Sequence, residues 1–366
     1  MQLLICAGGT GGGVYPALAV VQTLADNANV LWVGSEGGME STLVQRASIP
    51  FKTIPAAGLH GVGIKKLPRN LYLLAKGMLA ARQILNQFKP DVIFFTGGFL
   101  AVPMAVAARR TPIMLFVPDI EPGLAIKAIA KFSDRIAVTS LETKAFFNSK
   151  ARVLETGYPT RPSLITWTRN EGRKHFTIKG DKPILLVLGG SKGARSINNA
   201  VMNNLDRLLE ISEMIHVSGE LDWEEVNRRR ENIPPDKSPR YHCFPYLHED
   251  IGAALAAADL VISRAGASIL GEYPMFSLPA ILVPYPYAWR YQSVNAKYLV
   301  KNEAAVILED SKVGEELVPI VKQILDDPDK LIAMRNSMHS LYRPEAAKLI
   351  GDQLASLAKN RSLNSD

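Results

Sequence analysis

Four glycine-containing turns in this 366-residue chain have the residue types needed to hold a phosphate; they lie at 8–13, 97–98, 189–193 and 263–266. Each follows a short apolar run, so it is typical of a strand-to-helix turn. There, backbone N–H groups and the start of a helix can approach an anion. One such turn is equally well explained by close packing of a strand on a helix. Four of them in one chain favour a diphosphate ligand.

The first turn matches neither of two common nucleotide-binding motifs. No Lys followed by Ser or Thr comes after its last glycine, so it is not a P-loop. The next strand, Leu31-Trp32-Val33-Gly34, supplies no acidic residue where a dinucleotide ribose would bind. The glycines therefore indicate neither a P-loop enzyme nor a dinucleotide enzyme.

The turn at 263–268 is the most informative, because a carboxylate follows it. Its small residues Gly266, Ala267 and Ser268 would leave backbone N–H groups open to a phosphate. Glu272 comes six residues after Gly266, which we expect to be about two turns into a helix. A carboxylate there could accept hydrogen bonds from two ribose hydroxyls. Taken alone, Glu272 is better explained as a solvated helix residue, so its role depends on the rest of the pattern.

Apolar runs followed by glycines and helical patterns recur along the chain, which is typical of a parallel sheet built from βαβ units. We predict strands at 3–5, 30–33, 91–95, 112–117, 135–138, 184–188, 260–262 and 280–283. A first helix is expected at 16–25. The C-terminal segment from about Asp327 is predicted to be helical, with a break near Pro344.

The chain is longer than one hydrophobic core usually serves, and a Gly/Pro segment at 157–162 separates its halves. We predict an α/β fold of two doubly wound, Rossmann-like domains that face each other across a cleft. The boundaries are 1–157, 158–338 and a C-terminal helical segment, 339–366, for which packing back on the first domain is one arrangement. Ligands of such sheets bind beyond the carboxyl ends of the strands.

Composition narrows the classes of partner. The net charge of +7 is compatible with nucleic acid, an anionic membrane or a phosphorylated substrate. Two isolated cysteines and six scattered histidines form neither a disulfide framework nor a metal-ligand spacing. These features fit the cytoplasm and predict no metal. No apolar run approaches 20 residues, the N-terminus resembles a strand more than a signal peptide, and no basic aromatic groove for nucleic acid is evident.

Three motifs together are similar to those of the MurG family of UDP-N-acetylglucosamine transferases, which convert lipid I to lipid II in peptidoglycan synthesis. They are Gly9-Thr10-Gly11-Gly12, the run at 189–195, and 263–267 with Glu272. The resemblance covers nearly the whole chain, including 58–61, 97–99 and 156–161. It implies the two-domain GT-B fold, an inverting transfer from a UDP-sugar donor, most closely UDP-N-acetylglucosamine, to a lipid-linked acceptor, and no cofactor.

The resemblance also implies donor-binding residues: Thr10, Gly11, Gly12, Arg161, Ser191, Tyr246, Leu247, Arg264, Gly266, Ala267, Ser268, Glu272 and Gln292. By position, Tyr246 and Leu247 would border the uracil and Glu272 would hold the ribose. The diphosphate would meet Ser191 and the backbone at 266–268, with Arg161 and Arg264 nearby. Gln292 would meet the sugar hydroxyls.

Departures from the family pattern cluster on the acceptor side. Gly13 stands where the family usually has His, and the run at 116–119 replaces His-Glu-Gln-Asn. Tyr158 replaces Asn, and Tyr291 stands where the family often has Gln or His. A kept donor site with an altered acceptor site suggests a changed acceptor or lost activity.

An inverting transfer needs a general base for the acceptor hydroxyl and stabilisation of the leaving UDP. Asp119, Glu121 and His60 are the candidate catalytic residues. Asp119 beside Pro118 is equally typical of a turn, and His60 is more typical of a loop.

Apolar and basic residues alternate at helical spacing in 64–82. This pattern is commonest in a core-facing helix with a basic rim, but it also suits a helix at an anionic membrane surface. The family's lipid acceptor favours the second interpretation, a peripheral protein on the inner face of the cell membrane. Two alternatives remain: a related transferase with another glycolipid or metabolite acceptor, and a non-catalytic partner subunit. A UDP-sugar 2-epimerase of similar layout lacks support, because the glycine-rich N-terminal loop and the run at 263–266 match the transferase pattern better.

Overall fold

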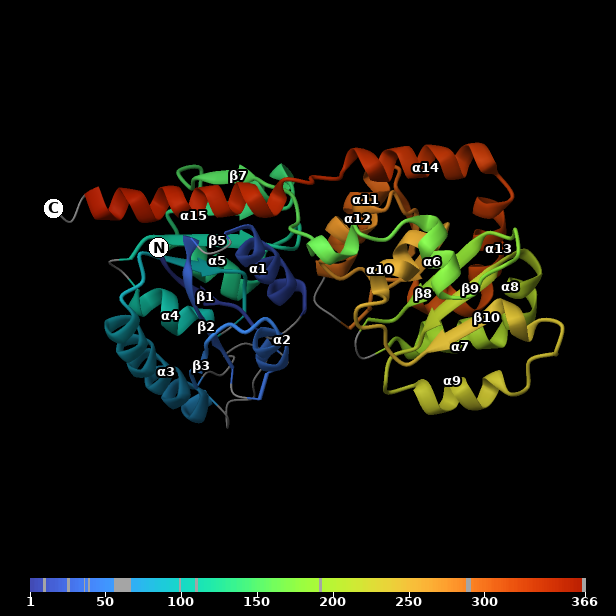
Figure 1. The fold of residues 1–366 in the computed structure, drawn as a ribbon, viewed down its shortest axis with the longest axis horizontal. Helices are drawn as coiled ribbons and strands as arrows, with labels where there is room; N and C mark the ends of the chain where they lie inside the picture. The colour runs from blue at the N-terminus through green and yellow to red at the C-terminus, as the bar shows by residue number, and fades with distance from the viewer. Residues whose placement is uncertain are drawn as a thin grey trace. The chain divides into compact units, whose positions relative to one another are not determined.

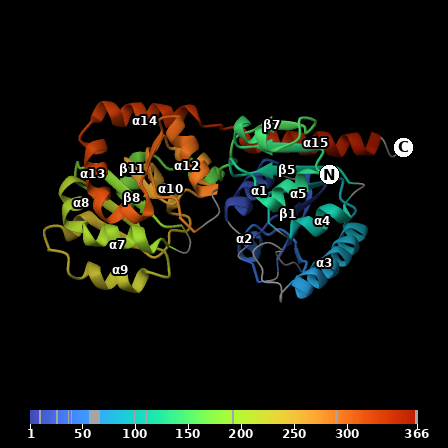
Figure 2. The same cartoon turned by 180° about the vertical axis from the view of Figure 1, so that it is seen from behind.

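The computed structural model describes residues 1–8, 11–24, 27–35, 37–38, 40–55, 67–98, 100–108, 111–190, 193–287 and 291–363. The chain divides into two compact units (Figures 1 and 2). Unit 1 consists of Met1–Arg161 and Arg343–Asp366, and unit 2 of Pro162–Tyr342. Each unit contains its own parallel sheet with helices, so the predicted α/β class is confirmed.

Unit 1 is built on a seven-stranded parallel sheet in the order β3-β2-β1-β4-β5-β6-β7. Its strands are β1 (Gln2–Cys6), β2 (Asn29–Gly34), β3 (Phe51–Thr53), β4 (Val92–Phe95), β5 (Ile113–Val117), β6 (Arg135–Val138) and β7 (Val153–Glu155). Every residue of β4 and β5 is buried, because helices cover both faces of the central strands. This explains why both strands are continuous apolar runs.

The helices of unit 1 are α1 (Gly11–Leu24), α2 (Glu40–Arg46), α3 (Leu67–Phe88), α4 (Ala101–Ala107), α5 (Leu124–Ala130) and α15 (Ala346–Leu363), with a 3-10 helix at Leu141–Phe146. The last helix, α15, packs against α1 although the two are far apart in sequence (Figure 1). Arg135 on β6 donates a hydrogen bond to the side chain of Gln353 and so ties α15 to the sheet. Among the described residues, no helix has the length and apolar character needed to cross a membrane.

Unit 2 is built on a six-stranded parallel sheet in the order β10-β9-β8-β11-β12-β13. Its strands are β8 (Ile184–Leu188), β9 (Glu213–Val217), β10 (Tyr241–Phe244), β11 (Leu260–Ser263), β12 (Ala280–Leu282) and β13 (Ala305–Ile307). Its helices are α6 (Arg169–His175), α7 (Arg195–Asn203), α8 (Leu205–Ile211), α9 (Trp223–Arg230), α10 (Ile251–Ala257), α11 (Ile269–Met275), α12 (Tyr291–Lys301), α13 (Val313–Leu325) and α14 (Pro328–Ser340).

Two local predictions were wrong. The first helix begins at Gly11, not near Pro16, because the glycines themselves form its first turn. Gly13 lies so close to Thr96 that an added Cβ would be 3.2 Å from the Thr96 carbonyl oxygen. Glu272 is in the first turn of α11, not two turns in, because residues 264–268 form a turn before the helix starts at Ile269.

Candidate functional site

Two of the glycine turns lie side by side at one edge of the unit 2 sheet. Strands β8 and β11 are parallel neighbours, with Leu188 opposite Ser263, so the turns that follow them leave the same edge. No atom of the described residues lies within 4 Å of a Cβ built on Gly190 or on Gly266. Both turns therefore have a side that the described protein leaves uncovered. The carboxyl edge of a parallel sheet is where such folds bind ligands.

The turn after β8 is held tightly on its other side. An added Cβ at Gly193 would lie 2.4 Å from the Ser218 carbonyl oxygen, and the φ angle of Gly193 is +81°. The Gly193 N–H donates to the Gly190 carbonyl at 2.9 Å, which closes the turn. The predicted residue Ser191, like Lys192, lies outside the described residues. The described glycines form a turn fixed against β9 and uncovered on the opposite side.

Arg264, predicted near the diphosphate, supports the turn after β11 through several contacts. Its guanidinium donates to Asp310 Oδ1 at 2.6 Å and to Ser196 Oγ at 2.8 Å. It also donates to the Val283 carbonyl at 3.0 Å and lies 5.2 Å from the centre of the Tyr285 ring. Arg264 thus connects the start of α7 with the ends of β11 and β12. In this arrangement Asp310 balances its charge.

Glu272 is half-buried in the first turn of α11. The next residue, Tyr273, is buried, and its phenol donates to Ser263 Oγ at 2.7 Å. Burial raises the pKa of this phenol well above its usual range, so Tyr273 stays a hydrogen-bond donor. The contact fixes α11 to the end of β11 and so positions Glu272 beside the uncovered turn.

Helix α12 contributes the predicted Gln292 and a second residue, Asn295, that the sequence did not predict. Gln292 Oε1 accepts a hydrogen bond from the Tyr285 N–H at 2.9 Å. One turn later, the buried Asn295 donates to the Ala265 carbonyl at 3.2 Å. Gln292 and Asn295 are three residues apart and share a helix face. That spacing is the signal that could have identified Asn295 as a support of the turn after β11.

The two residues predicted to border the uracil follow β10. Leu247 is buried, and Tyr246 is half-buried with its ring 4.7 Å from the His248 ring. The Ser218 N–H donates to the Phe244 carbonyl at 3.0 Å, which links this segment to the residue that contacts Gly193. Ser218 therefore contacts both the segment after β10 and the turn after β8.

In unit 1, the departure at Tyr158 has a local explanation. Pro16 has no N–H, so it cannot make the usual helical hydrogen bond to the carbonyl four residues earlier, that of Gly12. The Tyr158 phenol donates to this carbonyl at 3.1 Å. Tyr158 also packs edge-on against Phe116, a second departure, with ring centres 5.9 Å apart. The two residues that depart from the family pattern, Tyr158 and Phe116, are thus buried and pack against each other.

The remaining donor-binding predictions of unit 1 fall around α1. Gly11 and Gly12 open this helix, and the Arg161 guanidinium lies 4.2 Å from the centre of the Tyr15 ring, a cation–π geometry. Thr10 lies outside the described residues.

Two of the three candidate bases lie in the loop after β5. The carbonyls flanking Asp119, those of Pro118 and Ile120, accept hydrogen bonds from the hydroxyls of Thr139 and Thr143, each at 2.9 Å. Asp119 itself is partly exposed on this rigid backbone. Glu121 is buried, with its carboxylate 3.9 Å from Lys127 Nζ. The third candidate, His60, lies outside the described residues.

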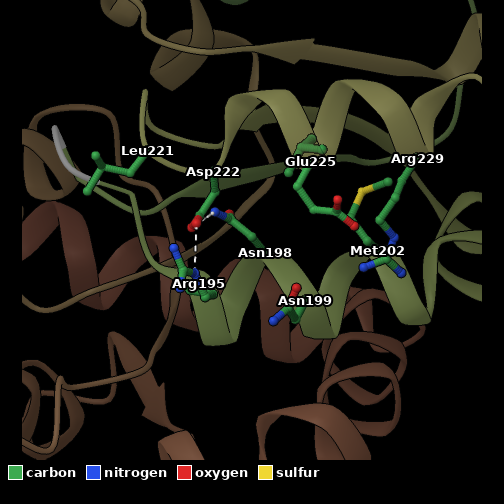
Figure 3. A pocket seen from close by; sticks show the side chains of 9 residues that line it. Arg195, Asn198, Asn199, Met202, Leu221, Asp222, Glu225 and Arg229 are labelled. Carbon is green, nitrogen blue, oxygen red and sulfur yellow. Dashed lines mark hydrogen bonds and ion pairs between the residues drawn. The ribbon is translucent and has the colours of Figure 1, made fainter.

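A separate pocket of about 290 Å³ lies between α7 and α9 (Figure 3). Its lining mixes polar residues, among them Arg195, Asn198, Asp222 and Arg229, with the apolar Met202, Leu221 and Val226. It contains none of the predicted donor-binding residues. Within the described ranges, no group of three or more His, Cys, Asp or Glu side chains is arranged to hold a metal ion.

Comparisons with known proteins agree with this architecture. Residues 3–138 match the glycosyltransferase family 28 N-terminal domain, and residues 184–350 match the C-terminal domain of the same family. A UDP-N-acetylglucosamine–N-acetylmuramyl-(pentapeptide) pyrophosphoryl-undecaprenol N-acetylglucosamine transferase of Roseiflexus sp. (strain RS-1) is 37% identical, covering 99% of this chain and 96% of its own. The protein of the same name from Desulforamulus reducens is 36% identical over 94% of this chain and 96% of its own.

Solved structures give the same result. Acinetobacter baumannii MurG superposes with a TM-score of 0.77 at 26% identity, covering 97% of this chain and 99% of that one. A UDP-GlcNAc 2-epimerase from Neisseria meningitidis reaches 0.69 at 12% identity, covering 97% and 100%, which shows a shared fold alone. The predicted GT-B fold is thus confirmed. The chain belongs to glycosyltransferase family 28.

Proposed function

We propose that this protein transfers N-acetylglucosamine from UDP-N-acetylglucosamine to the lipid-linked muramoyl-peptide acceptor, lipid I, in peptidoglycan synthesis. The observation that carries the proposal is the pair of uncovered turns at Gly190 and Gly266, on neighbouring parallel strands of unit 2. At both glycines, no side chain of the described residues lies in the way of a diphosphate that approaches the backbone N–H groups. The names and full-length similarity of the relatives support the same reaction.

For the donor, we propose that the uracil lies at Tyr246 and Leu247, the ribose at Glu272 and the sugar at Gln292. Ser191 and the backbone of residues 266–268 would contact the diphosphate. Arg264 would act mainly by holding the turn after β11, because Asp310 and Ser196 already bind its guanidinium. The resemblance also assigns Arg161, Thr10, Gly11 and Gly12 to the donor.

Calorimetric titration with UDP-N-acetylglucosamine, UDP-glucose and UDP tests the donor site. We expect Glu272→Ala to weaken binding of all three by about 1–3 kcal/mol, the cost of losing a charged hydrogen bond. Glu316→Ala, which removes an exposed glutamate on α13, is the matched control. Unchanged UDP affinity in Glu272→Ala would refute the ribose assignment. Failure of the wild-type protein to bind any of the three would refute the donor site and favour a non-catalytic partner subunit.

For the chemical step, we propose Asp119 as the general base that takes the proton of the acceptor hydroxyl. It is partly exposed on a backbone held on both sides, whereas Glu121 is buried beside Lys127. Asp119→Asn should lower kcat by about 10²–10⁴-fold, the usual contribution of a general base, with UDP affinity unchanged. Transfer from labelled UDP-N-acetylglucosamine to lipid I measures this. Full activity of Asp119→Asn, with loss in Glu121→Gln, would move the assignment to Glu121.

For the membrane, we propose that α3 contacts anionic lipid. Arg69, Tyr72, Lys76 and Leu79 are exposed and spaced along one face of this helix, whereas Ala81 and Ile84 are buried. A helix face that carries both apolar and basic side chains suits the headgroup region. The residues 64–66 of the predicted segment lie outside the described part of the chain.

Vesicle co-sedimentation tests the membrane face. Lys76→Glu should weaken binding to anionic vesicles by about 1–2 kcal/mol, since each basic residue near such a surface contributes about 1 kcal/mol. Arg207→Glu makes the same charge change on an exposed residue of α8 in unit 2 and should have no comparable effect. Equal losses in the two variants would show that net charge, not α3, governs binding.

A further inference from the structure

A buried histidine that the proposed reaction does not use lies behind the turn that follows β8. His216 on β9 is fully buried, and both of its ring nitrogens have partners. Nε2 lies 2.9 Å from Asn198 Oδ1, and Nδ1 lies 2.8 Å from the Tyr241 hydroxyl. Burial lowers the pKa of His216 to about 3, so the ring is neutral at physiological pH.

The direction of each hydrogen bond in this network follows from Asn198, which is buried on α7. Its amide nitrogen donates to the Ser218 carbonyl at 2.8 Å and to Asp222 Oδ2 at 2.9 Å. Both partners are acceptors only, so the amide oxygen must face His216. The proton of the neutral ring is therefore on Nε2, and Nδ1 accepts from Tyr241. The Tyr241 hydroxyl also lies 3.2 Å from Met202 Sδ, but a thioether is a weaker acceptor than a ring nitrogen, so its one proton goes to His216. The donors then run in one direction, from Tyr241 through His216 to Asn198.

The network ends on the support of the glycine turn. The Ser218 carbonyl that accepts from Asn198 is the atom that an added Cβ at Gly193 would meet at 2.4 Å. Asp222 also accepts from Arg195 Nε at 3.0 Å, and Arg195 is the first residue of α7 (Figure 3). The hydrogen bonds thus hold β9, the start of α7 and the start of α9 together immediately behind the turn.

We propose that His216 is a positioning residue for the UDP-sugar: its Nε2–H orients Asn198, which fixes the Ser218 carbonyl and hence the glycine turn that receives the diphosphate. The inference rests on the proposed donor site. His216 does not touch the donor. It acts two hydrogen bonds away, through Asn198 and Ser218. Since Ser218 also bonds the Phe244 carbonyl, the same network sets the segment that precedes Tyr246.

A matched pair of variants separates positioning from packing. The amide nitrogen of Gln reaches the place of Nε2, so His216→Gln keeps the donor to Asn198. The amide of Asn reaches only the place of Nδ1, so His216→Asn loses that donor. Asn198→Asp gives a further variant of unchanged shape, in which a carboxylate faces the acceptors Ser218 and Asp222. Tyr241→Phe removes the far end of the network and leaves the donor to Asn198 in place.

The measurements are the UDP Kd by calorimetry and the hydrogen-exchange rate of the Gly193 N–H, each with the thermal unfolding midpoint of the variant. We expect His216→Asn and Asn198→Asp to raise the Kd about tenfold, as for a lost buried hydrogen bond, and to speed exchange at Gly193. His216→Gln and Tyr241→Phe should stay within about threefold of wild type.

Equal effects of His216→Gln and His216→Asn on Kd would overturn the proposal, because packing alone would then explain them. Unchanged Kd and exchange in His216→Asn and Asn198→Asp would overturn it too. If His216→Asn does not fold, Asn198→Asp against Tyr241→Phe decides by the same criteria. A wild-type protein that binds no UDP would refute the donor site itself, and with it the reason for positioning the turn.

Discussion

The first glycine turn of unit 1 and the turn after β8 in unit 2 differ in what surrounds them. At the first, an added Cβ on Gly8 would lie 2.5 Å from Glu40 Oε1, and one on Gly13 would lie 3.2 Å from the Thr96 carbonyl. Tyr158 covers the Gly12 carbonyl. In the second, Gly193 is equally enclosed, but no described atom approaches the position of a Cβ on Gly190.

This difference shows that glycine density alone does not identify a ligand site. Gly8 and Gly13 of the first turn are explained by close packing within unit 1. Gly190 has a φ angle of +80°, a conformation that favours glycine, so its backbone already explains the residue. Gly266 has neither a close neighbour among the described residues nor a positive φ, so contact with a ligand is the remaining reason for a small residue there. Substitutions of single glycines can therefore separate packing from binding.

The largest effect is expected for Gly193→Ala. Alanine at φ +81° costs about 1–2 kcal/mol, and its Cβ would collide with the Ser218 carbonyl. We expect the free energy of unfolding of unit 2 to fall by about 3 kcal/mol, measured by urea denaturation. Gly314→Ala on α13, where no described atom lies within 4 Å, is the control and should stabilise slightly. Equal changes in the free energy of unfolding for Gly193→Ala and Gly314→Ala would show that Gly193 is not tightly enclosed.

The next effect is a pH dependence of stability, which we expect because His216, behind the turn after β8, is buried and neutral. Its pKa falls from 6.5 in the unfolded chain to about 3 in the folded protein. Between pH 6.5 and about 3, His216 is protonated in the unfolded chain but neutral in the folded protein. The free energy of unfolding therefore falls as the pH is lowered through this range. The slope is about 1.4 kcal/mol per pH unit, or roughly 2 kcal/mol at pH 5. Unfolding of wild type and His216→Gln should converge at low pH; parallel curves would show that His216 does not titrate this way.

Gly266→Ala tests whether the uncovered turn after β11 is needed for binding but not for folding. Because nothing described lies near its Cβ, folding stability should change by less than about 0.5 kcal/mol. UDP affinity should fall about tenfold, since the methyl group would occupy the path of a diphosphate. Calorimetry and a thermal unfolding scan measure the two effects. Unchanged UDP affinity would remove this turn from the donor site.

The smallest effect concerns Tyr158 in unit 1. Tyr158→Phe should lower the free energy of unfolding by about 1 kcal/mol, because the Gly12 carbonyl loses its donor. Pro16→Ala restores an N–H that can reach this carbonyl. In the Pro16→Ala background, Tyr158→Phe should therefore cost less, which a double-mutant cycle in urea denaturation measures. Independent, additive effects would show that Pro16 is not the reason for the contact.

Part of the secondary structure was predictable from particular residues, although β3, β7, β9, β10 and β13 were not among the predicted strands. The apolar runs at 91–95, 112–117 and 184–188 are strands, because both faces of a central parallel strand are buried and no alternation is required. The break near Pro344 separates α14 from α15. The start of α1 was missed, since a run of glycines gives no helical signal when close packing against Thr96 is the cause of the turn.

The sequence by itself determined the fold class, the glycine turns and their resemblance to one family of transferases, because these depend on local runs and spacings. Only the tertiary structure decided which turns are uncovered, that Arg264 is held by Asp310 and Ser196, and that Asn198, His216 and Tyr241 form one network. Such contacts join residues 18 to 68 positions apart. Their existence follows from the register of the strands and the packing of helices on the sheet, which no local pattern encodes.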